Sequence, residues 1–264
     1  MKIVAMLRVK DGILFAKRWL ENIGSLVDEI VVVDNGSTDG TFEILKAHPK
    51  VVLIERTEGF DEGRDKNMLY AMARRRKADW LFWLDVDEIF EEAFTREKLL
   101  NLITKKKVKR YFFRRFHFVD EENYNSEWYW LKYCSSPDRV LWRDQKSGYF
   151  ENIKFNNALV KGIKGKTTIS HFRLKHLGYI YKDEVKKKID NYRSIDPSLE
   201  KTYQSIQFTG EHKAKWLEFT ESPIRVTLLN LFLDLVWIFR FVPYKLKNIL
   251  TFYHTKINSG FIKI

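Results

Sequence analysis

The sequence predicts an α/β fold in which a mostly parallel sheet is flanked by helices. Two observations support this prediction. Strand-like and helix-like segments alternate through the first hundred residues, and the strand-like segments are nearly continuous apolar runs. Strands that are buried on both faces of a parallel sheet have this pattern, whereas half-exposed strands alternate apolar and polar residues. In such sheets a ligand binds at the carboxyl ends of the strands.

Four strands and three helices account for the first 85 residues. The strands are expected where short runs are rich in β-branched or aromatic residues, at 3–7, 29–34, 51–55 and 80–85. The helices are expected where apolar residues recur at helical spacing, at 13–25, 41–47 and 64–77.

The sequence changes character after the fourth strand. Residues 108–119 mix basic and aromatic side chains in a strand-like pattern, and short strands with turn signals follow. We expect 101–180 to complete the sheet of one domain, 1–180, whose first half is 1–100. Residues 181–264 are expected to follow as a helical, basic extension.

One segment of that extension is strongly apolar. In residues 226–242, 13 of 17 side chains are apolar, but Asn230, Asp234 and Arg240 interrupt the run, so it is not a clean membrane span. Thr227, Asn230 and Asp234 fall on one helical stripe, so the pattern predicts an amphipathic helix near 225–242 with a wide apolar face. No acidic residue follows Asp234, and this one-sided charge suits a helix that lies in a membrane interface. A core helix docked on the main domain fits the sequence as well.

Charge is unevenly divided along the chain. Residues 1–100 hold 16 basic and 19 acidic side chains, whereas residues 101–264 hold 31 and 16. Such a basic region suggests an anionic partner: nucleic acid, a phosphorylated substrate or a membrane surface. The aromatic content excludes a disordered chain, and the single cysteine, Cys134, excludes a disulfide scaffold. With no signal peptide recognisable at Met1, we expect a cytoplasmic protein.

The strongest chemical signal is a pair of carboxylates, Asp85 and Asp87, directly after an apolar strand. An extended segment would send both to the same side. Oxygen ligands suit Mg²⁺ or Mn²⁺, which proteins commonly hold with one or two carboxylates together with substrate phosphates. The alternative is a solvated loop or a cap for a helix over 89–94.

A second signal is the turn-rich segment 31–41, VVVDNGSTDGT. Its glycines allow the backbone to approach a ligand closely, and Asp34 and Asn35 can hydrogen-bond a base or a ribose. Ser37 and Asp39 can equally cap the following helix.

These blocks together resemble the family-2 glycosyltransferases, which have the nucleotide-sugar-binding GT-A fold. The similarity rests on MLRVKDG near the N-terminus, VVVDNGSTDGT after the second strand and LDVDE after the fourth, and it extends over about residues 1–180. The tryptophan-rich strand before D-x-D-E is most similar to the branch that includes lipopolysaccharide-core and other cell-envelope transferases. One departure is that the second strand ends in Asp-Asn rather than Asp-Asp.

The resemblance implies that 1–100 are the nucleotide-sugar-binding half of the domain and 101–180 the acceptor half, and it implies roles for particular residues. Asp34 and Asn35 would contact the nucleoside, and Asp85 would lie near the ribose. Asp87 would bind the metal that bridges the two phosphates, with Glu88 close to the metal or the sugar. Two residues of the first-strand loop would line the nucleotide pocket, Arg8 and Lys10. Four residues of a later segment would approach the base and the diphosphate: Arg64, Asp65, Lys66 and Asn67.

A histidine is implied as well. His176-Leu177-Gly178-Tyr179 matches a family pattern in which the histidine completes the metal shell or holds the diphosphate, and His171 is the alternative. Arg173 and Lys175 could neutralise charge on the leaving group.

The catalytic base is one of several carboxylates. An inverting transfer, which the resemblance implies, needs a carboxylate within hydrogen-bond reach of the acceptor hydroxyl. Asp138, Asp144 and Glu151 lie in the region where the family supplies it. Glu151 is the first choice and Asp138 the second.

The sequence therefore predicts a metal-dependent glycosyltransferase that uses a nucleoside diphosphate sugar and Mn²⁺ or Mg²⁺. Its acceptor would be a glycan, glycolipid or phosphorylated molecule in cell-surface synthesis, met at an anionic membrane face. Two alternatives are a nucleic-acid-binding protein that uses the basic and aromatic region, and a sugar nucleotidyltransferase. The first lacks an RNA-binding motif, and the second lacks the expected glycine-rich loop after the first strand.

Overall fold

The structure is a computed structural model of residues 1–264. It describes the chain except for residues 127–138, 155–158, 196–212, 219–222, 239–253 and 255–264. The chain forms two compact units, which are described separately. Unit 1 contains Met1–Arg114 and Pro137–Leu174, and unit 2 contains Arg115–Ser136 and Lys175–Ile264. The division into domains 1–180 and 181–264 stays a prediction.

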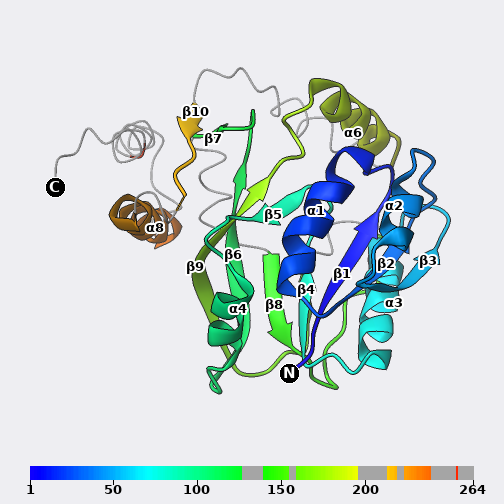
Figure 1. Ribbon diagram of the computed structural model, residues 1–264, viewed down its shortest axis with the longest axis horizontal. Coiled ribbons are helices and arrows are strands. Elements are labelled where there is room, and N and C mark those ends of the chain that lie inside the picture. The colour runs from blue at the N-terminus through cyan, green and yellow to red at the C-terminus, as the bar shows by residue number, and fades with distance from the viewer. Residues whose placement is uncertain (127–138, 155–158, 196–212, 219–222, 239–253, 255–264) are drawn as a thin grey trace. The chain divides into compact units, whose positions relative to one another are not determined.

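Strands and helices alternate through the start of unit 1, as the sequence predicts (Figure 1). The order is β1 (Ile3–Val9), α1 (Ile13–Leu26), β2 (Glu29–Asp34), α2 (Thr41–Ala47), β3 (Val51–Arg56), α3 (Glu62–Arg75) and β4 (Trp80–Trp83). The next elements are β5 (Glu88–Phe90), α4 (Arg96–Ile103), β6 (Val108–His117), β8 (Arg139–Arg143) and β9 (Lys166–His176).

These strands form one eight-stranded mixed sheet in the order β3-β2-β1-β4-β8-β6-β9-β5. The first four strands are parallel, and β8 joins β4 and β6 by antiparallel pairing. The predicted mixed, mostly parallel sheet with flanking helices is therefore confirmed. Because β2, β1 and β4 are adjacent and parallel, the residues that follow these three strands come together at one edge.

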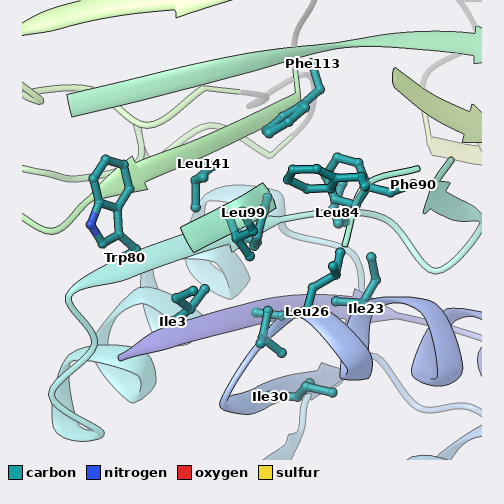
Figure 2. Packing of buried hydrophobic residues seen from close by; sticks show 14 of the residues in the cluster. Ile3, Ile23, Leu26, Ile30, Trp80, Leu84, Phe90, Leu99, Phe113 and Leu141 are labelled. Atoms are coloured by element: carbon teal, nitrogen blue, oxygen red, sulfur yellow. The ribbon is translucent and has the colours of Figure 1, made fainter. Parts of the chain in front are cut away.

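Side chains of β1 alternate between two apolar cores. Ile3, Ala5 and Leu7 belong to a core with α1 and α4, whereas Val4 and Met6 belong to a core with α3. This is the period-two geometry of a strand covered on both faces. Figure 2 shows part of the first core, where Leu26, Leu99 and Phe113 come from two helices and β6. Each fully buried side chain of this size contributes about 1.5–3 kcal/mol relative to exposure.

The antiparallel pairing of β4 with β8 fixes the edge at which Asp144, one of the candidate bases, lies. Val140 pairs with Trp83, so the chain enters β8 at the edge where β4 ends. Asp144 follows β8 and donates its backbone N–H to the carbonyl of Asp79, which precedes β4. Asp144 therefore lies at the edge of the sheet opposite the residues that follow β4.

Unit 2 contains a short antiparallel pair, β7 (Asn123–Asn125) with β10 (Lys213–Lys215), and the helices α6 (Lys182–Ile195) and α8 (Pro223–Ile238). Its core includes buried aromatic rings that pack edge to face, among them Phe116, Tyr124 and Trp216. Within the part of the chain that the structure describes, no helix is both long and apolar enough to cross a membrane.

The predicted polar stripe of α8 is only partly present. Thr227 and Asp234 are exposed, but Asn230 is buried on the same face as Val226 and Leu233. Three apolar side chains on the other face, Ile224, Leu231 and Leu235, are exposed.

Candidate active site at the carboxyl edge of the parallel strands

The loops that follow β1 and β2 are tied together by reciprocal hydrogen bonds. Asp11, at a positive φ of 48°, accepts the backbone N–H of Thr38 at 2.8 Å. In return, Thr41 Oγ1 and Asp39 Oδ2 accept the backbone N–H groups of Gly12 and Ile13, at 2.8 and 2.9 Å. Asp39 thus holds the two loops together and also accepts the backbone N–H of Thr41 at 3.0 Å. The cap residue of α2 is instead Gly40, with no side-chain cap hydrogen bond.

These bonds also affect the protonation of Asp39. Burial acts to raise the pKa of this carboxyl, but the hydrogen bonds from Thr41 and from the N–H of Ile13 outweigh it and lower the pKa. The carboxylate is therefore ionised when it anchors the loops.

Asp34, the last residue of β2, has one saturated and one unsatisfied oxygen. Its Oδ1 accepts the backbone N–H groups of Gly36 and Ser37, at 3.0 and 2.9 Å, and Arg56 Nε at 3.3 Å. Gly36 adopts a φ of +83°, which this tight turn requires and which favours glycine. The Oδ2 atom is buried and makes no hydrogen bond with any described residue. A buried carboxylate oxygen without a donor is costly, and a ligand N–H or O–H would satisfy it.

Asn35 is held by its side-chain amide. Its Nδ2 donates to Thr57 Oγ1 at 2.6 Å and to Asp65 Oδ2 at 2.8 Å, and Asp65 is fully buried. Asp65 in turn accepts Arg64 Nε at 2.8 Å, while the other nitrogens of Arg64 donate to the carbonyls of Glu58 and Gly59. Asn35 and Asp65 are therefore brought together, and Arg64 supports Asp65 instead of extending freely into the site.

A basic cluster joins Arg8 of β1 to Lys66 of α3 through Glu62. Arg8 Nη2 is 3.3 Å from Glu62 Oε1, and Lys66 Nζ is 3.9 Å from the other oxygen of Glu62. Lys66 is 2% exposed, and its ammonium group lies 4.3 Å from the centroid of the Trp83 ring. Arg8 Nε is buried without a hydrogen-bond partner among the described residues. Lys10 follows β1 and is exposed.

Glu62 was not among the predicted site residues, although it joins Arg8 to Lys66. The signal for it was present: Glu62 precedes Lys66 by four residues, which is the spacing of an ion pair on one helix face. Asn67, which was predicted, instead bonds the carbonyls of Gly63 and Phe150 and thereby fixes the segment that contains Glu151.

The carboxylates after β4 lie in a turn and not in an extended segment. β4 ends at Trp83, and the backbone N–H of Glu88 donates to the carbonyl of Asp85 at 3.1 Å. The carboxylate of Glu88 accepts the N–H of Asp85 at 3.0 Å. The argument that an extended strand aligns Asp85 with Asp87 therefore does not apply. Asp87 is nearly buried and Asp85 is partly exposed.

This turn lies against the loop after β1. A Cβ atom added to Gly12 would be 2.9 Å from a methyl group of Val86. A larger residue at position 12 would force the side chains of Val86 and Val9 to shift, so glycine favours the close packing of this turn against the loop after β1.

The described residues do not contain a complete protein cage for a metal. Among them, no group of three or more His, Cys, Asp and Glu side chains could hold an ion. Two hard carboxylates in one turn, Asp85 and Asp87, nevertheless fit a cation that takes its other ligands from substrate phosphates and water.

Glu151 lies beside the first turn of α3. The backbone N–H groups of Glu62 and Gly63 donate to the carbonyls of Lys154 and Ile153, at 3.1 and 3.0 Å. The Glu151 side chain is about half exposed and is 3.7 Å from Lys161 Nζ. Asp138 lies outside the described residues.

Asp144 has a local structural role. It accepts the Tyr70 hydroxyl at 2.6 Å and Arg74 Nε at 3.0 Å. Burial and the hydrogen bond to Asp144 raise the pKa of Tyr70 to about 12.

His176 is in unit 2, where its Nδ1 atom is 2.9 Å from Nδ1 of His117. Both rings are buried, and the ring of Tyr179 packs against each of them. His171, the alternative, is in unit 1, and burial followed by the charges of Lys105 and Lys98 lowers its pKa. Nearby lysines do not favour a cation site at His171.

Arg173 and Lys175 both have carboxylate partners. Arg173 is buried and donates through Nη2 to Glu91 Oε2 at 2.6 Å. Lys175 forms an ion pair with Glu218 and lies over the Trp216 ring. These pairs leave both cations engaged within their own units.

Residues 15–173 match the model of glycosyl transferase family 2. The chain belongs to this family. The match covers more than half of the sequence and includes the elements that contribute Asp34, Asn35, Lys66, Asp85 and Asp87.

Two curated relatives are uncharacterized proteins of Mycobacterium bovis and Mycobacterium tuberculosis. Each is 31% identical over 99 residues, which is 34% of this chain and 24% of the relative. The chain thus matches about a quarter of the length of these proteins.

Similar solved structures have low sequence identity. A mannosyltransferase from Pyrobaculum calidifontis, solved with GDP-Man and Mn²⁺, is 17% identical, with a TM-score of 0.41 over 57% of this chain and 48% of that one. TarS residues 1–349 from S. aureus are 13% identical, with a TM-score of 0.47 over 99% and 91% of the two chains.

Proposed function

We propose that this family member transfers a sugar from a nucleoside diphosphate sugar to an acceptor hydroxyl, with the help of a divalent cation. The observation that supports the proposal most is that β1, β2 and β4 are adjacent and parallel and end at one edge. Arg8 is the next-to-last residue of β1, Asp34 is the last residue of β2, and the Asp85–Asp87 turn follows β4. This edge of the sheet therefore supplies hydrogen-bond acceptors for a nucleoside, cations for phosphate and oxygen ligands for a metal.

In this proposal the nucleoside binds at the end of β2. The unsatisfied Oδ2 of Asp34 accepts a hydrogen from the base or ribose. Asn35 has both amide hydrogens engaged by Thr57 and Asp65, so it offers its carbonyl oxygen as a further acceptor. Arg64 fixes Asp65 and hence Asn35, which makes it a positioning residue.

The diphosphate would meet the basic cluster. Arg8, Lys66 and the exposed Lys10 can neutralise phosphate charge, and Lys66 is buried, which strengthens its electrostatic interactions. Asp85 and Asp87 would hold Mn²⁺ or Mg²⁺, which when bound neutralises charge on the leaving diphosphate. His176 is proposed as a further contact to the metal or diphosphate by family resemblance.

The acceptor hydroxyl needs a base, for which we propose Glu151, with Asp138 as the alternative. Glu151 is partly exposed and lies beside the helix turn that carries Glu62, so an incoming hydroxyl can reach it. Direct attack with one base would invert the configuration at the transferred carbon.

We propose a glycan, glycolipid or phosphorylated molecule of the cell surface as the acceptor, met by a cytoplasmic enzyme at an anionic membrane face. The basic excess of residues 101–264 favours such a surface. Nucleic acid is a poorer partner, because Tyr111, Phe113 and Phe116 of the basic and aromatic run are buried and could not stack on bases.

A thermal-shift screen of nucleotide sugars tests the donor site. The proposal predicts that a nucleoside diphosphate sugar raises the melting temperature more with Mn²⁺ than without it, and that Asp34→Ala removes the shift. Asp79→Ala, at the opposite end of β4, serves as the control and should keep it. No shift for donors carrying any of the common bases would contradict the proposal.

A further inference from the structure

The exposed face of α8 is apolar. Ile224, Leu231 and Leu235 are 67%, 54% and 52% exposed, and Leu228 between them is partly exposed. Positions four, seven and eleven residues after Ile224 fall on one side of a helix. These four side chains, the α8 stripe, therefore form one continuous aliphatic surface.

The stripe is not the surface that anchors α8 in unit 2. Val226, Leu229 and Leu233 are buried, and they point to the other side of the helix together with Asn230. Thr227 and Asp234 are exposed along one border of the stripe, so the polar part of the helix is narrow. A helix that already buries one apolar face has a second one left for a partner.

The charge pattern of the sequence at and after α8 points to the class of partner. Arg225 on α8 is exposed. The thirty residues after Asp234 hold five basic residues and no acidic one: Arg240, Lys245, Lys247, Lys256 and Lys263. Exposed aliphatic side chains, followed in the sequence by a segment whose only charges are positive, are complementary to an anionic lipid surface, which offers hydrocarbon and negative headgroups together.

We propose that the α8 stripe is the surface that inserts into an anionic lipid membrane, with α8 lying in the plane of the interface. α8 has 16 residues, which is shorter than a helix needs in order to span the hydrocarbon core. This inference rests on the part of the proposed function that brings the enzyme to a membrane, and it names the residues that make the contact.

Vesicle co-sedimentation of the full chain tests the inference. We compare vesicles of phosphatidylcholine with vesicles that contain about 30% phosphatidylglycerol, for the wild type and for Leu231→Gln/Leu235→Gln. The wild type should bind the anionic vesicles, and the double variant should bind them at least about tenfold more weakly, because each leucine loses its transfer into hydrocarbon. Leu14→Gln is the matched control, since Leu14 is 53% exposed on α1, and it should bind like the wild type.

Two further measurements distinguish a failure of this inference from a failure of the proposed function. Metal-dependent donor hydrolysis in solution should be equal in the wild type and all variants. If the wild type itself does not hydrolyse the donor, that result counts against the proposed function and not against the α8 stripe. Light scattering measures the molecular mass in solution and so shows whether the chain forms a dimer. The vesicle-binding test is repeated with Ile224→Gln, a third position of the α8 stripe. Equal vesicle binding by wild type and stripe variants would overturn the inference. A wild type that is a dimer, with stripe variants that are monomers, would also overturn the inference. The same holds if the variants have a lower melting temperature but unchanged vesicle binding.

Discussion

The side-chain amide of Asn35 donates to Asp65 Oδ2 at 2.8 Å. This contact gives a physical reason for Asn35 directly after Asp34 at the end of β2, where the family resemblance leads one to expect Asp-Asp. A carboxylate at position 35 would place two negative charges against each other in a buried site. The amide avoids that repulsion while it holds the same geometry.

Asn35→Asp should therefore make donor binding depend on pH. The pKa of the introduced carboxyl group is raised by its neighbour, so the protonated form, which can still donate to Asp65, is present at low pH and lost as pH rises. Calorimetry with the nucleoside diphosphate should show affinity falling at least about tenfold between about pH 5 and pH 8 in the variant. A variant with the same weak pH dependence as the wild type would contradict the role given to this contact.

Lys66→Met should weaken donor binding with little loss of stability. The methionine can replace the buried stem beside Trp83, whereas the positive charge for the phosphates is lost. A hydrogen bond to a charged group contributes about 1.5–3 kcal/mol, so the dissociation constant of the nucleoside diphosphate should rise about tenfold or more. Lys17→Met, on the exposed side of α1, should bind as the wild type does. Equal affinities in the two variants would remove Lys66 from the phosphate site.

Arg173→Met should destabilise unit 1 without affecting the donor. It leaves the carboxylate of Glu91 buried and uncompensated, which costs about 3–5 kcal/mol in urea unfolding. The double variant Glu91→Leu/Arg173→Met should recover much of that loss and bind the donor normally. Weak donor binding in the stable double variant would show that Arg173 does act on the leaving group.

His254 should make unit 2 sensitive to acid. Its Nε2 is 3.0 Å from the Tyr124 hydroxyl, and burial lowers its pKa to about 3. The unfolded chain takes up this proton near pH 6.5 and the folded chain only near pH 3, so stability is full above pH 6.5 and falls as pH decreases. The loss should approach about 1.4 kcal/mol per pH unit, and His254→Phe should flatten the profile. Equal acid sensitivity in that variant would assign the effect to other groups.

Local signals predicted most of unit 1. The sequence indicates β2 at 29–34 and α2 at 41–47, and the structure has the same bounds, because β-branched runs and turn formers mark both ends. The apolar runs of the parallel strands also place Asp34 at the carboxyl edge, since each strand is buried on both faces.

Other features depend on contacts that are distant in sequence. Glu88 closes the Asp85 turn through its own carboxylate, which a strand pattern does not indicate. Asp144 lies at the wrong edge for a base because β8 runs antiparallel to β4, and strand direction cannot be read from the apolar pattern. The partnership of His176 with His117 joins residues 59 apart and has no local signal.

The measurement that tests the central claim most directly is Mn²⁺-dependent hydrolysis of the donor sugar by Asp87→Asn. This change keeps the size of a nearly buried side chain and removes one charge from the proposed cation site. The account predicts that hydrolysis is lost while the melting temperature stays close to that of the wild type, and that Asp79→Asn keeps full activity. Unchanged metal-dependent turnover in Asp87→Asn would contradict it.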